Sequence, residues 1–201
     1  MRGVDAEYRA YTIEQGSKRV HEVEEALITP AILGIEAGDP ARRLVGLDYR
    51  LKGRNRLAEK VLHHLRANPD ISCEEAFRKV KDAIRYTFQY PENRYADGVH
   101  ADCRRLMGAG FEAVDLRNSW SDGESKGINS RWRVAGNGQL FEVQFHTRAS
   151  FEARRLTHDA YERLRDPVTP KAERDALARY QREVSTRITT PPGAPDIPSY
   201  R

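Results

Sequence analysis

The chain has 201 residues, with 34 basic and 30 acidic side chains and a formal net charge of +4. This length suits one domain with short flanking segments, and a hydrophobic fraction of 39% is enough for a buried core. No apolar run approaches the roughly 18 residues of a transmembrane helix. The two cysteines cannot build a disulfide framework or a zinc site alone. These counts exclude a membrane-spanning protein, a disulfide scaffold and a zinc module, and we expect a cytoplasmic protein.

Hydrophobic spacing and turn residues predict the elements of the N-terminal half. In chain order they are one or two helices over 5–35, a strand over 45–52, a helix over 56–65, a helix after the capping box of Ser72 and Glu75, a strand over 83–90 and a helix closed by Gly108–Gly110.

The C-terminal half predicts a strand over 111–117, a polar loop over 119–129, a hairpin of 131–134 with 139–147, a helix over 151–164, a last helix beginning at Pro170 and a proline-rich extended arm over 189–201. The order of these helices and strands along the chain predicts an α+β fold, with a mixed sheet of about five strands and helices packed on it. We expect three parts: a helical segment over 1–44, a domain over 45–188 and the arm over 189–201.

The predicted strand over 139–147 alternates strictly between apolar and polar residues. One face carries Phe141, Val143 and Phe145, and the other carries Glu142, Gln144 and His146. The polar set is either an ordinary solvated face or the floor of an active site, in which Glu142 holds a metal or acts as a base. Asp82, at the entry of the strand over 83–90, is either a surface residue at a helix end or a partner of Glu142 in binding magnesium with a nucleotide.

Two further segments carry candidate ligand-binding residues. Residues 50–60 contain five cations at a strand-to-helix junction, which make either a solvated basic face or a clamp for a triphosphate. In the loop over 119–129, Lys126 precedes Gly127, where the backbone can approach a ligand closely. Trp120 and Trp132 either stack on bases or pack in the fold.

The segment Glu142-Val-Gln-Phe-His-Thr147 resembles the Glu-x-Gln-x-Arg-Thr strand of RelA/SpoT-type alarmone synthetases, which move pyrophosphate from ATP to a nucleotide 3′-hydroxyl. The other motifs of that family match in the same order within residues 45–165. They are Arg50-x-Lys52 with Lys60, Arg85, Lys126-Gly127 with Ser130, and Glu152 with His158 and Tyr161.

The resemblance implies a nucleotidyltransferase-like synthetase fold and an ATP-dependent pyrophosphokinase with Mg²⁺ as cofactor. It implies that Glu142 and Arg85 are catalytic and that Asp82 and Glu142 bind the metal. The implied ATP-binding residues are Arg50, Lys52, Arg56 and Lys60. The implied acceptor-binding residues are Arg117, Lys126, Gly127, Ser130, Trp132, His146 and His158.

The acceptor motifs depart from the family pattern. Ile128 stands where the family has a tyrosine that stacks on guanine, and His146 replaces an arginine. Because the guanine platform is missing, the sequence favours adenine slightly over guanine in the acceptor. Trp120 or Trp132 would supply a replacement ring, unless Trp132 belongs to the core of the hairpin.

Three functions remain open at this stage. The first is synthesis of a small hyperphosphorylated nucleotide from ATP and a purine nucleotide. The second is a toxin, delivered to the cytoplasm of a target cell, that pyrophosphorylates the 3′ end of tRNA. The third is a catalytically dead domain that binds a nucleotide or a protein. For none of these functions do we expect a membrane as a partner.

Overall fold

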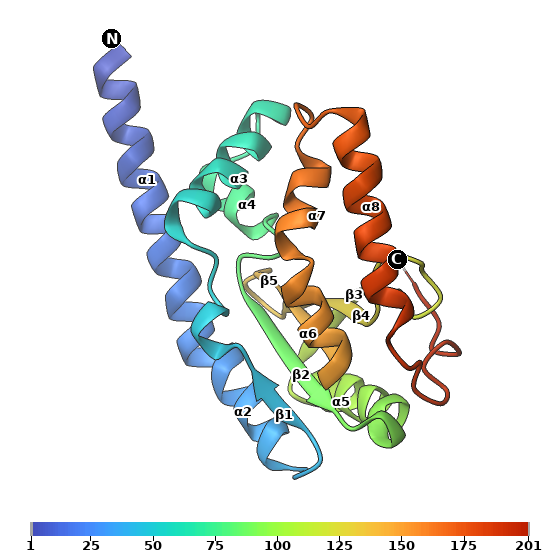
Figure 1. Cartoon of the computed structure of the whole chain (residues 1–201). Coiled ribbons are helices and arrows are strands. Elements are labelled where there is room, and N and C mark those ends of the chain that lie inside the picture. Colours follow the sequence, from blue (N-terminus) through green and yellow to red (C-terminus); the bar gives the residue numbers. More distant parts are fainter. Residues whose placement is uncertain (1, 201) are drawn as a thin grey trace.

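A five-stranded sheet forms the centre of the computed structural model, which describes residues 2–200 and their side chains from Thr12 onward (Figure 1). The strands are β1 (Arg43–Val45), β2 (Arg85–Tyr90), β3 (Phe111–Asn118), β4 (Ile128–Val134) and β5 (Leu140–Thr147). Their order is β1-β2-β5-β4-β3, with β2 and β5 parallel and the other neighbours antiparallel. This arrangement confirms the expected α+β fold with a mixed sheet.

The helices surround this sheet on both faces (Figure 1). They are α1 (Arg2–Val23), α2 (Thr29–Ala37), α3 (Arg54–Ala67), α4 (Cys73–Arg78), α5 (Tyr95–Gly108), α6 (Arg148–Leu156), α7 (His158–Arg165) and α8 (Lys171–Thr186). A π-helical turn, Glu24–Ile28, connects α1 to α2, and the predicted capping box of Ser72 and Glu75 begins α4. No helix within the described part of the chain is long and apolar enough to cross a bilayer.

The apolar face of the sheet forms the core. The alternation of β5 buries Phe141, Val143 and Phe145 completely, and β2 sets Phe88 directly beside Phe145. Helix α5 packs over this face, where the Tyr95 hydroxyl donates to the Phe145 carbonyl oxygen at 2.8 Å. These contacts fix the register of β2 and β5, because a slip by one residue would turn the apolar side chains outward.

The opposite, polar face of the sheet is covered as well. Helix α6 crosses β5 and β2 on this side, and α7 and α8 continue beside it (Figure 1). Gln144 and His146 of β5 are therefore buried, with exposed fractions of 1% and 3%. Burial of polar groups is costly unless they are paired, so this face is not the ordinary solvated face that the alternation alone allows.

Two elements near the site differ from those that the sequence predicts. The segment 45–52 is not a continuous strand, because Gly46 has a positive φ of 70° and a 3₁₀ turn over Leu47–Tyr49 follows it. Only an isolated bridge from Leu51 to Ile84 rejoins the sheet. The predicted helix over 151–164 is divided into α6 and α7 at Thr157, whose hydroxyl donates to the Ala153 carbonyl oxygen at 3.0 Å.

The arm over 189–201 is not extended where the structure describes it. Ala194 and Ile197 are buried, and Tyr200 forms an antiparallel bridge with Leu116 of β3. The Asn118 side-chain amide donates to the carbonyl oxygens of Ala194 and Ile197, at 2.8 Å each. This segment therefore covers the edge strand of the sheet, which would otherwise present unpaired backbone groups.

Candidate functional site

Parallel pairing of β2 with β5 brings two predicted catalytic residues together. Arg85 and Glu142 are partners in the register, and the Arg85 Nε lies 3.1 Å from the Glu142 Oε2. Asp82 precedes β2, and its Oδ2 lies 3.5 Å from a terminal nitrogen of the same guanidinium. Asp82 and Glu142 thus meet through Arg85, at the entry of β2 and on the polar face of the sheet.

Two of the predicted ATP-binding lysines join this group. Lys60 of α3 contacts both carboxylate oxygens of Asp82 at 2.7 Å, and Lys52 lies 3.0 Å from Oδ2. The backbone positions Lys52, whose N–H donates to the Ala83 carbonyl oxygen at 2.9 Å. We call the five residues Lys52, Lys60, Asp82, Arg85 and Glu142 the donor cluster.

The donor cluster is partly buried and carries an excess positive charge. It holds three cations and two carboxylates, which leaves a net charge of about +1 at neutral pH. Burial raises the pKa of Asp82, but the hydrogen bonds from Lys60 and Lys52 outweigh it, so this pKa lies below its usual value. Burial lowers the pKa of Lys52, and its hydrogen bond to Asp82 offsets this only in part. A site of this kind favours polyphosphate ligands over neutral ones.

Asp82 and Glu142 also fit a magnesium ion. Both carboxylates reach one guanidinium, so they lie on the same side of the fold. Mg²⁺ is commonly held by one or two carboxylates with substrate phosphates and water completing its shell. Within the described residues no group of three or more potential metal ligands occurs, so such an ion would depend on a bound nucleotide for its remaining ligands.

Sequence reasoning missed one cation of this region, Arg154 of α6. This side chain is half-buried and interacts electrostatically with Arg85, Glu142 and Tyr161. The signal was present, because Arg154 follows Ser150 by four residues and Ser150 contacts His146 on the polar face. The sequence instead predicts an inward face of Ala153, Leu156, Ala160 and Leu164 for the helix over 151–164, and this is wrong for Leu156, which is 68% exposed.

The side chains of two other predicted ATP-binding residues form no hydrogen bond or ion pair with the donor cluster, although the Arg50 carbonyl oxygen accepts from the Arg85 backbone N–H at 2.7 Å. The Arg50 Nε donates to the Oε1 of Glu24 at 2.8 Å, and Glu24 is fully buried in the π-helical turn. The Tyr86 hydroxyl donates to the same oxygen at 2.7 Å. Arg56 is exposed on α3 and forms no ion pair with the residues the structure describes. An ATP-binding role for Arg50 or Arg56 remains a prediction.

The predicted acceptor loop uses several of its polar groups internally. The Lys126 ammonium donates to the carbonyl oxygens of Trp120 at 2.7 Å and Asp122 at 2.8 Å. Gly127 has a φ of 141°, and a Cβ there would come within 2.6 Å of the His146 ring. Glycine at this position is therefore required by the fold, whether or not a ligand approaches.

Ser130 and Trp132 lie on the core face of β4 and are fully buried. The Ser130 hydroxyl donates to the Val143 carbonyl oxygen at 2.9 Å and accepts from the Trp132 Nε1 at 2.8 Å. Trp120 is buried too, with its ring edge-on to Tyr95. The idea that Trp120 or Trp132 stacks on a base is wrong, and the assignment of Ser130 and Trp132 as direct acceptor ligands is corrected: these side chains belong to the core.

The other three acceptor candidates do not converge. His146 is buried beneath Gly127, with its Nδ1 2.9 Å from the Ser150 hydroxyl, so it supports the loop from inside. Arg117 is exposed and lies 3.1 Å from the Asp122 carboxylate. His158 is exposed at the start of α7. Arg117 and His158 are accessible to a ligand, and their roles remain predictions.

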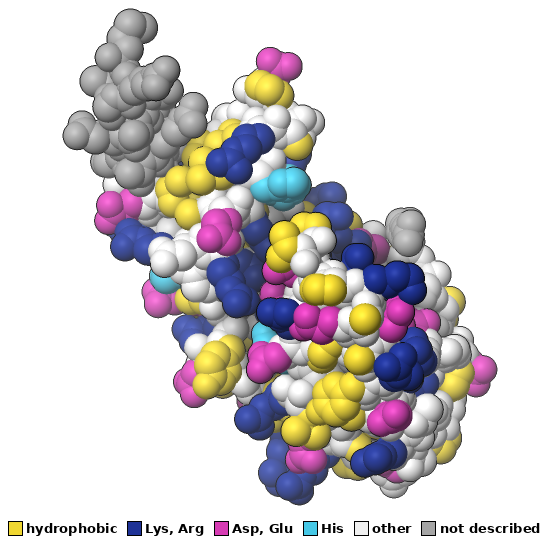
Figure 2. Space-filling view, turned by 45° about the horizontal axis from the view of Figure 1, so that its top comes forward, with side chains coloured by type: hydrophobic (Ala, Val, Ile, Leu, Met, Phe, Trp, Pro, Cys, Tyr) yellow, Lys and Arg dark blue, Asp and Glu magenta, His cyan; other side chains and the backbone are white. Residues whose placement is uncertain are grey.

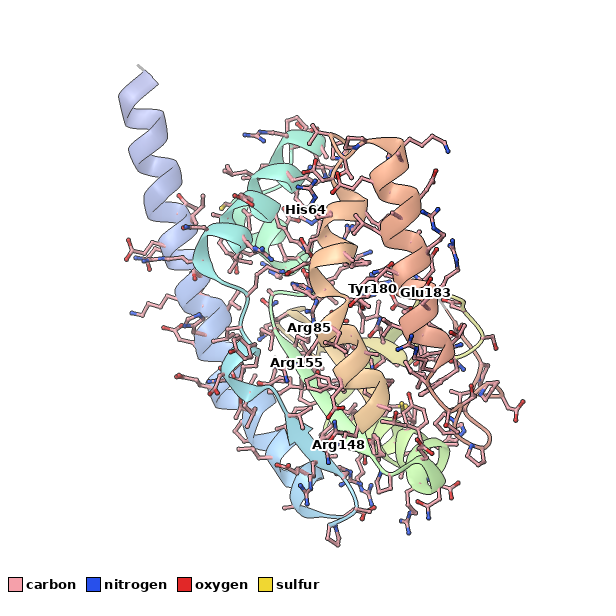
Figure 3. All side chains as sticks on the ribbon, in the orientation of Figure 1. His64, Arg85, Arg148, Arg155, Tyr180 and Glu183 are labelled. Carbon is pink, nitrogen blue, oxygen red and sulfur yellow. The ribbon has the colours of Figure 1, made fainter. Side chains whose placement is uncertain are left out.

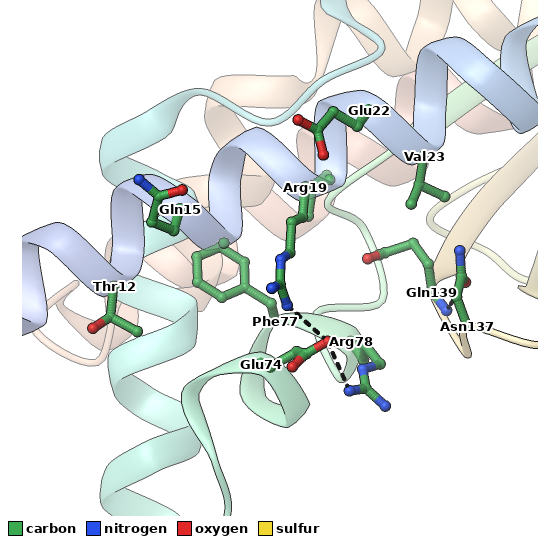
Figure 4. A pocket seen from close by; sticks show the side chains of 12 residues that line it. Thr12, Gln15, Arg19, Glu22, Val23, Glu74, Phe77, Arg78, Asn137 and Gln139 are labelled. Atoms are coloured by element: carbon green, nitrogen blue, oxygen red, sulfur yellow. Dashed lines mark hydrogen bonds and ion pairs between the residues drawn. The ribbon is translucent and has the colours of Figure 1, made fainter.

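Lys and Arg side chains gather where the α3 part of the molecule meets the part formed by α6–α8 (Figure 2). A cavity of about 460 Å³ lies elsewhere, between α1, α4 and the turn from β4 to β5 (Figure 4). Glu74 bridges it, paired with Arg19 at 3.0 Å and Arg78 at 3.1 Å. No predicted site residue lines this cavity, and its charges neutralise one another. The donor cluster is therefore the better candidate site.

Comparison with known proteins supports the fold. No family model and no curated protein matches the chain. Solved structures similar to it include smu.1046c of Streptococcus mutans, with 16% identity over 84% of this chain and 86% of that one and a TM-score of 0.56. A GTP pyrophosphokinase family protein of Streptococcus pneumoniae has 14% identity over 84% and 86%, with a TM-score of 0.52.

The small alarmone synthetase 1 of Bacillus subtilis is also similar, with 18% identity over 91% of each chain and a TM-score of 0.51. The similarity therefore covers most of both proteins. The fold implied by the resemblance in the sequence is thus confirmed: the chain has the fold of an alarmone synthetase.

Proposed function

We propose that this protein is a pyrophosphokinase that transfers the β,γ-pyrophosphate of ATP to the 3′-hydroxyl of a purine nucleotide. The donor cluster is the observation that carries the proposal. Lys52, Lys60 and Arg85 converge on Asp82, with Glu142 beside them, on a sheet of the alarmone synthetase fold. No covalent nucleophile is needed, because phosphoryl transfer depends mainly on positioning and on stabilisation of charge.

In this reaction the acceptor oxygen attacks the β-phosphorus of ATP. The new bond joins the 3′-oxygen to that phosphorus, and the bond from the β-phosphorus to the oxygen bridging it to the α-phosphate breaks. AMP leaves with the electron pair, and the hydroxyl proton passes to Glu142. The carboxylate of Glu142 suits this task because it projects from a rigid strand and its orientation is fixed by Arg85.

The three cations bind and orient the donor phosphates. Lys52 and Lys60 already contact an anionic group, Asp82, in the free protein. Bound phosphates would accept hydrogen bonds from the same ammonium groups and release Asp82 toward a metal. Mg²⁺, held by Asp82 and Glu142, would neutralise charge on the β- and γ-phosphates.

We propose an adenine nucleotide as the preferred acceptor. Ile128, at the position of the family's guanine-stacking tyrosine, is fully buried and pairs with Phe145 in the register, so it offers no platform to a base. With both tryptophans in the core as well, the acceptor must be held mainly through exposed polar groups such as Arg117.

The test is incubation of the purified protein with γ-labelled ATP, magnesium and, separately, AMP, ADP, unlabelled ATP, GDP, GTP and tRNA. Label on an adenine nucleotide supports the proposal in full. Label on a guanine nucleotide refutes the adenine preference, and label on the 3′ end of tRNA identifies a toxin-type activity. Binding of ATP without any transfer identifies a catalytically dead domain.

A further inference from the structure

Arg154 is a half-buried arginine beside the donor cluster, where it interacts electrostatically with Arg85 and Glu142. It forms no hydrogen bond or ion pair with any residue that the structure describes, although its helix packs directly on the sheet. A half-buried cation near other cations is normally paired with a carboxylate, because the repulsion among like charges is otherwise uncompensated. Arg154 has no such carboxylate of its own among the described residues.

The surroundings of Arg154 do not supply its missing partner. Partial burial, together with repulsion from the like charge of Arg85, lowers the pKa of Arg154 to about 10. Glu142 attracts it, but this carboxylate already accepts from Arg85 on one oxygen and from the Gln144 amide on the other. Tyr161 contributes a weaker electrostatic interaction.

The helix holds Arg154 in this position. The Thr147 hydroxyl caps α6 by accepting from the Ser150 N–H, and Ser150 in turn contacts His146 of β5. Arg154 lies one turn beyond Ser150, on the same side of α6 and toward the end nearer Arg85. Arg148, at the opposite end of α6, is exposed and paired with Glu152 at 2.9 Å (Figure 3).

We propose that Arg154 is a phosphate-binding residue of the donor site. It contacts the transferred pyrophosphoryl group from the α6 side, while Lys52, Lys60 and Arg85 bind the same group from the side of β2 and α3. This inference rests on the proposed function for the identity of the ligand. A polyphosphate supplies the anionic oxygens that Arg154 lacks, and a guanidinium can bind two of them at once.

The first experiment measures binding of inorganic pyrophosphate and of the ATP analogue AMPCPP, each with magnesium, by calorimetry. Arg154→Met preserves length and apolar contact but removes the charge, and Arg154→Lys keeps the charge without the planar fork. We expect the affinity for both ligands to fall by about 10- to 100-fold in Arg154→Met and by a smaller factor in Arg154→Lys. Arg148→Ala is the matched control and should bind within about twofold of wild type.

The second measurement is the thermal midpoint of the same variants without ligand. Arg154 makes no hydrogen bond or ion pair with the described residues of the free protein and is repelled by Arg85, so Arg154→Met should unfold at a temperature equal to or higher than wild type. An arginine with a purely structural role would instead lower the midpoint when removed. If Arg154→Met fails to fold, the proposal is overturned, because removal of a cation without a hydrogen bond or ion pair should not have that effect.

The two proposals fail in distinguishable ways. Wild-type affinity for pyrophosphate in Arg154→Met would overturn the role of Arg154, even if the wild type transfers label to a nucleotide. Loss of pyrophosphate binding in that variant, with no transfer by the wild type to any acceptor, would preserve the anion site and refute the pyrophosphokinase.

Discussion

The donor cluster and the acceptor loop carry similar sequence signals but differ in what the fold does with them. In the donor cluster, Lys52 and Lys60 both pair with Asp82. Arg85 of β2 joins the same carboxylate to that of Glu142 on β5. In the loop between β3 and β4, Lys126 is held by carbonyl oxygens, and the following strand buries Ser130 and Trp132. Polar and aromatic residues in a motif are therefore not equally available to a ligand.

The physical basis of this difference is charge. Several cations around one carboxylate repel one another, and an anionic ligand relieves that repulsion. The loop groups, by contrast, already have neutral partners within hydrogen-bond distance, and they gain little from a ligand. A residue whose interactions remain unbalanced in the free protein is the better candidate for binding.

The largest expected effect is that of Glu142→Gln. This change keeps the shape of the side chain but removes the charge and the basicity, so we expect transfer to fall by about 10²- to 10⁴-fold. The measurement is the rate of label transfer from ATP, with thermal unfolding as a check on the fold. Glu112→Gln, an exposed carboxylate of β3 paired with Arg133, is the matched control. A rate within a few-fold of wild type would remove Glu142 from the mechanism.

Lys52→Ala and Lys60→Ala should have the next largest effect. Each removes one charge-assisted contact to the donor phosphates, on the order of 1.5–3 kcal/mol, and should raise the Kd for ATP by about 10- to 100-fold. The KM for the acceptor should change much less. Lys18→Ala, an exposed lysine of α1, is the control. Unchanged ATP affinity in both variants would show that the lysines serve only to neutralise Asp82.

Trp132→Phe tests the acceptor side of the comparison. The variant loses the hydrogen bond from Nε1 to Ser130 and part of a fully buried ring, so we expect the free energy of unfolding to fall by about 1–3 kcal/mol. The KM for the acceptor should stay within about twofold of wild type. Urea unfolding and steady-state kinetics measure the two quantities. Tyr180→Phe, an exposed ring of α8, is the control. A raised KM with unchanged stability would return Trp132 to the acceptor site.

Much of the fold could be predicted from the sequence, because its strongest signals are local. The alternation in β5 and the capping box of Ser72 and Glu75 both appear as expected. The segment 45–52 was assigned wrongly because its alternation continues through Gly46, whose positive φ turns the chain out of the sheet. The split at Thr157 lies in its backbone angles, a φ of −96° and a ψ of 5°, which periodicity does not reveal.

The donor residues could be predicted mainly because the resemblance to alarmone synthetases assigns roles to charged groups at fixed offsets in the sequence. Arg154 was missed because its role depends on the absence of a partner, which only the packing of α6 on the sheet reveals. Trp132 shows a different limit. The sequence leaves open whether this ring stacks on a base or packs in the core of the hairpin, and the pairing of β4 with β5 confirms the core position beside Phe141.

His146 gives the smallest expected effect, a pH dependence of stability. Burial, aided by the charge of Arg154, lowers the pKa of His146 to about 3 in the folded protein, whereas an unfolded histidine titrates near 6.5. Between these values the unfolded state binds a proton that the folded state does not. The free energy of unfolding should therefore decrease as the pH falls below about 6.5, by up to about 1.4 kcal/mol per pH unit from this residue.

His146→Gln, measured by urea unfolding at pH 7.5, 6.5 and 5.5, should show a shallower decrease than wild type, because it lacks the titrating group. His100→Gln, at an exposed position of α5, should retain the wild-type slope. Equal slopes for wild type and His146→Gln would mean that the imidazole is reached by water and protonated in the folded state, and that the support beneath Gly127 is looser than the structure implies.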